Sequence, residues 1–288
     1  MNSQVAATID AHRAAGREFD AGGVRSFVRE EGEGDPVVLM HGIPASSFLY
    51  RKVLPLLAAR GLRGVAFDLP GLGLAEKRLD LDYTWSGLGR WTGAAIDALG
   101  IERCHLVIHD IGGPIGLEWA LRNRDRVRSL TALNTMIDVD GFRRVWSMNL
   151  AAPPLLGPAW VAASRPPAAR WLFYLQGIAD RAATPAHDVD AHIALLHRDG
   201  GGRSFRRIVR GFERTAEKER LYLDGLRGAG WPATIVWGER DPALGSDRRH
   251  AVERALGLEA KLLPAKHFLQ EDQAPAVADA IAALAARS

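Results

Sequence analysis

The segment His109-Asp110-Ile111-Gly112-Gly113 places one reactive side chain among small residues. The apolar run Cys104–Ile108 precedes it, and a helix-like run begins at Pro114. A sharp strand-to-helix turn of this kind exposes its central side chain for nucleophilic attack. Because the central residue Asp110 carries a carboxylate, we expect displacement at an sp3 carbon, which yields an alkyl-enzyme ester. This chemistry favours epoxides or alkyl halides over carboxylic esters as substrates.

Three further groups of polar residues follow apolar runs that have the length of buried strands. They are His41-Gly42-Ile43-Pro44 after residues 37–40, Gly238-Glu239-Arg240-Asp241-Pro242 after residues 233–237, and Lys266-His267-Phe268-Leu269 after residues 261–263. After Asp110 has attacked, a neutral His267 would take a proton from the water that hydrolyses the ester. Asp241 would accept the other ring N–H of His267 and so fix its tautomer.

Hydrolysis of the ester passes through an oxyanion, which needs hydrogen-bond donors. Ile111 directly follows the expected nucleophile, and Ile43 lies in the His41-Gly42-Ile43-Pro44 turn. The backbone N–H groups of these two residues are the expected oxyanion hole.

Other roles for some of these residues stay open at this stage. Taken alone, Asp110 is equally consistent with a helix N-cap. Asp241 is also consistent with a turn residue before Pro242. Asp138 also follows an apolar run, so it competes with Asp241 as the acid. We interpret His41 and His109, which flank the site, as scaffold residues.

The elements that must position these residues alternate between strands and helices. We expect strands at 24–30, 37–40, 63–67, 104–109, 127–133, 233–237 and 261–263, and helices at 48–59, 85–99, 114–122 and 274–287. The first two strands, joined by the turn signal of residues 31–35, are expected to form an antiparallel hairpin. The alternation predicts an α/β fold with a mostly parallel sheet flanked by helices.

The alternation stops between about residues 136 and 230, where helical segments are separated by Pro153-Pro154 and Pro166-Pro167. We therefore predict a core domain of residues 1–135 and 231–288 and a helical cap domain of residues 136–230. The cap should lie over the carboxyl ends of the strands, where ligands bind in such sheets.

Composition describes an ordinary globular protein, with 47% apolar residues and a net charge of +3 from 37 basic and 34 acidic residues. The single cysteine, Cys104, excludes an intramolecular disulfide. The polar N-terminal stretch from Met1 to Asp20 has no signal-peptide core, and no run approaches the roughly 18 apolar residues that span a bilayer. These features predict a cytoplasmic protein. The expected hydrolysis by an aspartate nucleophile needs no cofactor and no metal, and we predict neither.

The densest basic stretch contains Arg203, Arg206, Arg207, Arg210 and Arg214. We interpret it as a solvated helix face rather than a docking face, and it lacks the interleaved aromatic residues typical of nucleic-acid binding.

Several motifs resemble those of haloalkane dehalogenases and epoxide hydrolases, which belong to the α/β-hydrolase superfamily. These motifs are His41–Arg51, Asp68–Gly73, the turn around Asp110, and His267–Asp272. The chain order Asp110, Asp241, His267 is also the order of that superfamily. The resemblance implies an α/β-hydrolase fold with a helical cap inserted after the sixth strand.

The dehalogenases that the chain resembles hold the leaving halide with two N–H donors. Ile111 stands where their tryptophan follows the nucleophile, and Ile43 stands where an asparagine is frequent. A cap tryptophan (Trp146, Trp160 or Trp171) could supply one donor, which is fewer than the family pattern. Ile111 and Pro114 likewise replace the arginines of fluoroacetate dehalogenases, which argues against a small carboxylate substrate.

The epoxide hydrolases that the chain resembles donate to the epoxide oxygen from two cap tyrosines. Tyr174 and Tyr222 are the candidates here. Trp171 stands where the first tyrosine is expected, and Phe205 takes the place of the second. A pair of Trp160 or Trp171 with Tyr222 is an alternative donor set.

We therefore predict an epoxide hydrolase that converts an epoxide to a vicinal diol. The alternatives are a haloalkane dehalogenase and, more remotely, a non-catalytic receptor with the same fold. The expected ligand is a small apolar or aromatic substrate, with no nucleic acid and no membrane as partners. A homodimer stays open.

Overall fold

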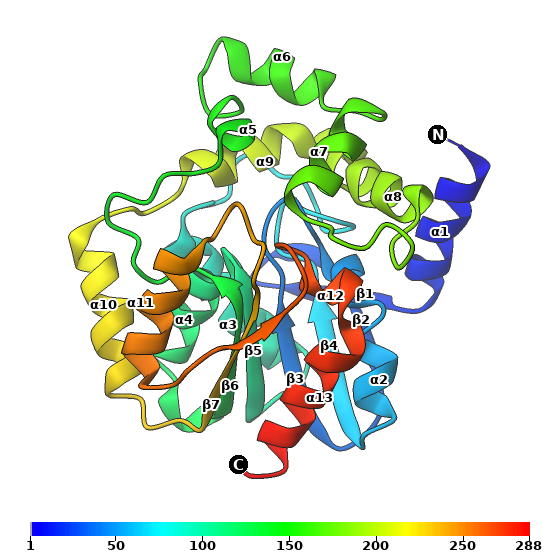
Figure 1. Ribbon diagram of the computed structural model, residues 1–288. Coiled ribbons are helices and arrows are strands. Elements are labelled where there is room, and N and C mark those ends of the chain that lie inside the picture. The colour runs from blue at the N-terminus through cyan, green and yellow to red at the C-terminus, as the bar shows by residue number, and fades with distance from the viewer. Residues whose placement is uncertain (1) are drawn as a thin grey trace.

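An eight-stranded sheet runs through the middle of the protein and has helices on both faces (Figure 1). The computed structural model describes residues 2–288. The strands are β1 (Arg17–Ala21), β2 (Val24–Glu31), β3 (Asp35–Met40), β4 (Leu62–Phe67), β5 (Cys104–Asp110), β6 (Val127–Thr135), β7 (Ala233–Gly238) and β8 (Lys261–Leu263). Across the sheet their order is β1-β2-β4-β3-β5-β6-β7-β8.

Strands β3 to β8 are parallel to their neighbours, whereas β2 is antiparallel to both β1 and β4. The expected hairpin between residues 24–30 and 37–40 was wrong, because β4 lies between β2 and β3. The hairpin is instead β1–β2, whose two-residue turn, Gly22 and Gly23, has positive φ at both positions (54° and 74°). That conformation matches the twist of a tight antiparallel hairpin.

The helices of the core cover the sheet from both sides. They are α2 (Leu54–Ala58), α3 (Trp85–Ala98), α4 (Gly112–Ala120), α11 (Ser246–Leu256), α12 (Leu269–Asp272) and α13 (Ala274–Ala285), with the 3₁₀ turns η1 (Ser47–Tyr50) and η2 (Arg124–Arg126). The first helix, α1 (Ser3–Ala14), packs elsewhere. The helix expected at 48–59 is divided into η1 and α2.

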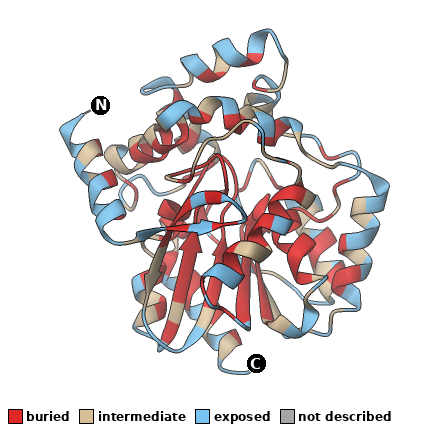
Figure 2. Cartoon of the chain, turned by 180° about the vertical axis from the view of Figure 1, so that it is seen from behind, coloured by how far each residue is buried: buried red, intermediate tan, exposed pale blue. Residues whose placement is uncertain are grey.

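Alternate side chains of the central strands serve two separate hydrophobic clusters. In β3, Val38 and Met40 pack with residues of α3, α4 and α11, whereas Val37 and Leu39 pack with residues of α2 and α13. Successive side chains of a strand point to opposite faces, so an uninterrupted apolar strand indicates a sheet that is buried on both sides. The buried colour of the strands in Figure 2 shows the same arrangement.

A helical segment follows β6 and lies above the carboxyl ends of the strands (Figure 1). It contains α5 (Trp146–Asn149), α6 (Leu156–Ala163), α7 (Ala168–Gln176), α8 (Ala186–His197), η3 (Arg198–Gly200) and α9 (Gly201–Arg210). The last helix before β7, α10 (Ala216–Arg227), lies instead beside α11 and α4 of the core (Figure 1). The expected fold, a mostly parallel sheet with helices inserted after the sixth strand, is therefore confirmed. We call residues 136–230 the cap, and its domain boundaries stay a prediction.

The polar N-terminal stretch forms α1, which the sequence patterns did not indicate. Val5 and Ile9 of α1 pack against Ala191 and Leu195 of α8 in a small separate cluster. The first helix of the chain therefore supports the cap rather than the sheet. Among residues 2–288, no helix is both long enough and apolar enough to cross a membrane.

A buried carboxylate, Glu271 of α12, joins the core to the cap. It pairs with Arg51 and with Lys52 (2.8 Å) of the core, and with His192 (2.8 Å) of α8. Arg51 also pairs with Asp188 of α8 at 2.7 Å. Burial would raise the pKa of the Glu271 carboxyl, but the charge of Arg51 and the contact with His192 hold this pKa well below its usual range. The network therefore stabilises the folded protein only while Glu271 is ionised.

Replacement of this carboxylate should destabilise the whole fold. We expect Glu271→Gln to lower the free energy of unfolding by about 3–5 kcal/mol, because it leaves buried cations without their counter-charge. Asp279→Asn is the matched control, since Asp279 pairs with Arg60 at the surface, and it should cost under about 1 kcal/mol. Urea denaturation measures both. Because the pKa of Glu271 is depressed, the difference in unfolding free energy between wild type and Glu271→Gln should shrink as the pH falls below about 4.3, the ordinary glutamate pKa. Equal losses in the two variants would contradict this account.

Candidate active site

Asp110 lies at the end of β5 in a strained backbone conformation, with φ at 53°. A positive φ is rare for residues with a side chain and is found at functional sites. The turn closes tightly because glycines surround it. A Cβ on Gly42 would lie 2.1 Å from Oδ1 of Asp110, and a Cβ on Gly113 would lie 1.8 Å from Oγ1 of Thr135. The glycines in the two motifs therefore allow the backbone to approach the carboxylate from both sides.

The Asp110 carboxylate accepts a hydrogen bond at Oδ1 from the backbone N–H of Ile43, at 2.8 Å. The backbone N–H of Ile111 also favours its ionised form. The structure thus places both expected oxyanion donors beside Asp110. An oxygen bound to the Asp110 carbonyl carbon during ester hydrolysis would form within reach of the same two groups.

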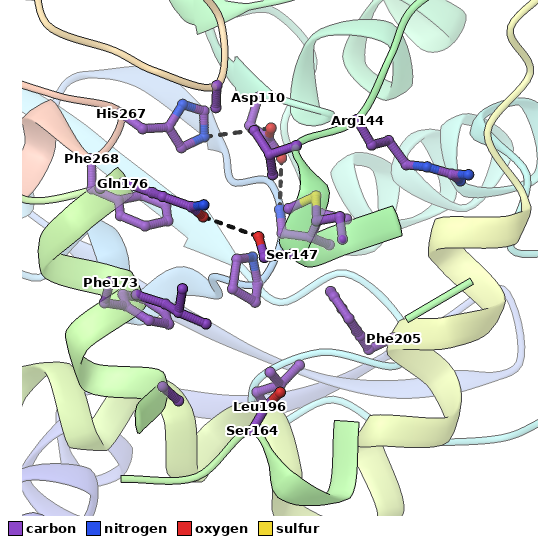
Figure 3. A pocket seen from close by; sticks show the side chains of 18 of the residues that line it. Asp110, Arg144, Ser147, Ser164, Phe173, Gln176, Leu196, Phe205, His267 and Phe268 are labelled. Atoms are coloured by element: carbon purple, nitrogen blue, oxygen red, sulfur yellow. Dashed lines mark hydrogen bonds and ion pairs between the residues drawn. The ribbon is translucent and has the colours of Figure 1, made fainter. Parts of the chain in front are cut away.

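His267, in the loop after β8, faces both expected acidic partners. Its Nε2 lies 3.4 Å from Oδ2 of Asp110, and its Nδ1 lies 2.8 Å from Oδ2 of Asp241. All three side chains are buried, with exposures of 5–6%. Figure 3 shows Asp110 and His267 directed toward each other at one side of a cavity. The structure therefore brings together the three residues that the sequence singled out from three different strand ends.

Asp241 is held in place by more groups than the sequence indicated. Its Oδ1 accepts from the backbone N–H groups of Ala243 (2.7 Å) and Leu244 (3.0 Å). Its Oδ2 accepts from Nδ2 of Asn134 at 2.6 Å, and Oδ1 of Asn134 accepts from the backbone of Gly238 at 2.8 Å. Sequence reasoning missed Asn134. Its position at the end of β6, directly before the cap, was the available signal.

The charges in the site stabilise one another. Burial alone would lower the pKa of the His267 imidazole, but the charge of Asp241 and the hydrogen bonds to Asp110 and Asp241 raise it to about 10. Burial would raise the pKa of the Asp110 carboxyl, but the hydrogen bond and charge of His267 lower it. At neutral pH the free protein therefore holds an imidazolium between two carboxylates.

The remaining polar candidates near the site have structural roles. Nε2 of His41 accepts from the backbone N–H of Leu69 at 3.0 Å, and Nε2 of His109 donates to the carbonyl oxygen of His267 at 2.9 Å. Burial lowers the pKa of both imidazoles, that of His109 to about 3, so both are neutral. Asp138 pairs with Arg248 at 2.6 Å and not with His267.

A cavity of about 130 Å³ opens beside Asp110 and His267. Its lining is mostly apolar, with residues from the core (Ile43, Leu244 and Phe268) and more from the cap (Met136, Phe142, Val161, Leu172, Phe173, Leu196, Phe205 and Phe212). The cavity therefore suits an apolar ligand. Among residues 2–288, no group of three or more histidine, cysteine, aspartate or glutamate side chains is placed to hold a metal ion.

Three of the four expected cap donors lie outside this cavity. Trp171 is 56% exposed on the outer side of α7. The hydroxyl of Tyr174 donates to the carbonyl oxygen of Thr184 (3.0 Å), and that of Tyr222 donates to the buried Glu118 (2.9 Å). Trp160 does line the cavity, but its indole N–H donates to the carbonyl oxygen of Ser147 at 2.9 Å. The predictions for Trp171, Tyr174 and Tyr222 were wrong because helical spacing alone did not show which face of each cap helix points inward.

The cavity instead contains a polar pair that sequence reasoning missed, Ser147 of α5 and Gln176 of α7. The Ser147 hydroxyl lies 3.1 Å from Oε1 of Gln176 and donates to it. Figure 3 shows both side chains directed into the cavity, below the His267 ring. With its oxygen engaged, the Gln176 amide has N–H groups to offer a ligand.

The arginine stretch of α9 is not only a solvated face. Arg206 donates to the carbonyl oxygens of Ala151 (3.0 Å) and Pro153 (2.8 Å), and Arg214 donates to that of Phe142 (2.9 Å). Two of the five arginines therefore tie together the backbone of the cap.

Removal of Asp241 should change the acidity of His267. We expect Asp241→Asn to lower the pKa of His267 from about 10, because the charge of Asp241 is the largest influence that raises it. Asp138→Asn should leave it unchanged, since Asp138 pairs with Arg248. Titration of the imidazole by NMR, assigned with the His267→Gln variant, measures both. If the pKa of His267 falls in Asp138→Asn, or does not fall in Asp241→Asn, the acid is not Asp241.

Comparisons with known proteins agree with this geometry. A family model described as the alpha/beta hydrolase fold matches residues 35–274. A haloalkane dehalogenase from Mycobacterium marinum is 29% identical over 265 residues, which cover 86% of this chain and 84% of that protein. The solved structure of the epoxide hydrolase CorEH has a TM-score of 0.80 at 20% identity and covers 94% of this chain and 98% of its own. That of the haloalkane dehalogenase DatA from Agrobacterium tumefaciens has a TM-score of 0.77 at 24% identity and covers 94% and 96%. The chain therefore belongs to the α/β-hydrolase fold family, and the relatives that it resembles include haloalkane dehalogenases and epoxide hydrolases.

Proposed function

We propose that this protein is an epoxide hydrolase that uses Asp110 as its nucleophile and acts on an apolar or aromatic epoxide. One observation carries the proposal. The Asp110 carboxylate, ionised and held at 2.8 Å from the Ile43 N–H, faces an apolar cavity in which the single lining indole, Trp160, has its N–H engaged by the protein.

The first step is attack by an Asp110 oxygen on an epoxide carbon. A C–O bond to Asp110 forms, the ring C–O bond breaks, and the ring oxygen leaves as an alkoxide. Ester formation removes the negative charge of Asp110, which is one cause of the raised pKa of His267. His267 therefore gives up its proton at this stage, and this proton balances the charge of the alkoxide.

The second step is hydrolysis of the ester. Neutral His267 takes one proton from water, and the resulting hydroxide adds to the ester carbonyl carbon. The bond between this carbon and the ester oxygen then breaks, and the departing alkoxide takes the proton of the added hydroxyl to become the second hydroxyl of the diol. The Ile43 and Ile111 N–H groups stabilise the oxyanion, and loss of one such donor typically costs about 3 kcal/mol. His267 ends the cycle protonated and Asp110 ends it ionised, as they began.

A haloalkane dehalogenase is the second candidate, and the similarity to the Mycobacterium marinum enzyme over 86% of this chain favours it. A departing halide, however, needs donors in an apolar cavity, where an unpaired anion is costly. The two isoleucines at the family positions for such donors, Ile43 and Ile111, offer only their backbone groups. An epoxide oxygen stays attached to the product, so ring opening releases no free anion into the cavity.

Gln176 is the donor that we assign to the epoxide oxygen. Displacement at carbon places the leaving oxygen on the side away from the attacking Asp110, which is the cap side of the cavity. Gln176 and Ser147 are a hydrogen-bonded polar pair on that side (Figure 3). Ser147 holds the amide oxygen, so the amide N–H groups are directed toward the ligand.

Removal of this amide should slow ring opening. We expect Gln176→Leu to lower kcat for an epoxide by roughly tenfold to a hundredfold, since a donor to a developing negative charge acts mainly in the transition state. Trp171→Phe is the control, because Trp171 is exposed on the same helix, and it should keep wild-type kcat. Steady-state kinetics on one epoxide compares the two. A larger loss in Trp171→Phe would return the donor role to that tryptophan.

The His267→Gln variant should trap the intermediate, because only the second step needs the base. We expect incubation with a 1,2-epoxide to add the mass of the whole epoxide to the intact protein, and peptide mapping to place it on Asp110. A matched 1-haloalkane should add nothing.

Other outcomes of this experiment have definite meanings. A gain equal to the alkyl group, with halide released, would show a dehalogenase. The absence of adducts from both series, together with unchanged behaviour of Asp110→Asn assayed promptly after purification, would contradict Asp110 as nucleophile and favour a non-catalytic receptor.

A further inference from the structure

Exposed large apolar side chains gather on three cap helices. We call this group the cap patch. It contains Trp146, Leu150, Leu155, Leu156, Trp171 and Leu175, from α5, α6 and α7 and the turns beside them. Leu155 and Leu156 are 88% and 67% exposed. Of the large apolar side chains that are exposed in the described chain, only three others lie elsewhere, namely Leu221, Leu258 and Leu262.

The cap patch lies on the outer side of helices whose inner side lines the cavity. Ser147, Trp160 and Gln176 of the same three helices line the substrate cavity. The Trp160 indole bonds to the backbone of α5, and its ring lies 6.0 Å from that of Trp146. Figure 1 shows α5, α6 and α7 together at the end of the molecule farthest from the C-terminus. The outward side chains therefore have no place left in the interior and are available to a partner.

The chain segment that carries the cap patch has charges of one sign and is flanked by the exposed Asp140 and Asp180. Residues 141–179 contain four arginines and no aspartate, glutamate or lysine, whereas the whole chain is nearly balanced. Arg143 and Arg165 are exposed, and neither has a carboxylate within ion-pair distance among residues 2–288. Arg170 differs, because it pairs with Asp190 at 2.6 Å. The partner of this surface should therefore be negatively charged and able to accept apolar side chains.

We propose that the cap patch docks on an anionic lipid surface. Tryptophan and leucine side chains insert at the level of the lipid headgroups, and arginines beside them bind the phosphates. A second copy of this chain fits less well, because a symmetric dimer would set Arg143 and Arg165 against the same patch, which has no unpaired acid. Our expectation that no membrane is a partner considered only spanning segments, and surface docking needs no long apolar run.

Vesicle co-sedimentation of the full chain tests this proposal. Vesicles of phosphatidylcholine alone are compared with vesicles that also contain phosphatidylglycerol. We expect binding to the anionic vesicles, with a blue shift of tryptophan fluorescence and a loss of binding at high salt. The double variant Leu155→Ser/Leu156→Ser should abolish most binding. Arg143→Gln and Arg165→Gln should each weaken it about fivefold, as about 1 kcal/mol per arginine predicts.

Leu262→Ser is the matched control, because Leu262 is also an exposed leucine (47%) but lies on β8. It should bind vesicles as the wild type does. Equal binding by all variants, or none by the wild type, would overturn the proposal. A different result would be a wild type that sediments as a dimer, fails to bind vesicles, and becomes a monomer in Leu155→Ser/Leu156→Ser. That result would assign the surface to a second copy of the chain. Turnover of a water-soluble epoxide should be unchanged in these variants, so failure of this proposal is distinct from failure of the proposed function.

Discussion

The backbone conformation of Asp110 is the constraint from which the arrangement of the site follows. A φ of 53° turns the chain sharply between β5 and α4 and lifts the carboxylate out of the sheet. An extended residue here would continue the strand and bury its side chain against a sheet face. The strain is balanced by close packing, since Gly42, Gly112 and Gly113 let three backbone segments meet around one side chain. Thr135 fixes the turn further by donating to the Asp110 carbonyl oxygen at 2.7 Å.

Sequence patterns were sufficient for the parts of the molecule that depend on parallel strands. Each catalytic candidate lies at or shortly after the carboxyl end of a parallel strand, and parallel strands end at one edge of the sheet, so Asp110, Asp241 and His267 had to converge. The β1–β2 hairpin was missed because β1 is a short edge strand with three exposed residues and little apolar pattern. The pairing of β1 with β2 is local, and the Gly22-Gly23 turn was the available signal. The pairing of β2 with β4, which separates β2 from β3, depends instead on long-range contacts that local periodicity does not report.

The cap was harder to predict because its helices are short and apolar on more than one side. In α7, Phe173 and Gln176 face the cavity, while Trp171 and Leu175 face outward. Both sides carry aromatic or aliphatic residues, so a helical pattern of apolar positions does not identify the inner one. Gln176 was overlooked because a single amide between apolar residues carries no local signal. Asn134 was overlooked because its partner, Asp241, is 107 positions away in the chain.

The loop that carries His267 is also one of the attachments of the cap. The Phe268 N–H donates to the carbonyl oxygen of Gly177 (2.8 Å), the Asp272 carboxylate accepts from Ala179 (2.7 Å), and Glu271 binds His192. A thermal fluctuation that releases the cap must therefore break contacts within five residues of His267, the proposed base. Heat inactivation of this protein should consequently follow detachment of the cap, at temperatures where the sheet is still intact. A form that has lost its cap but keeps His267 in place should not accumulate.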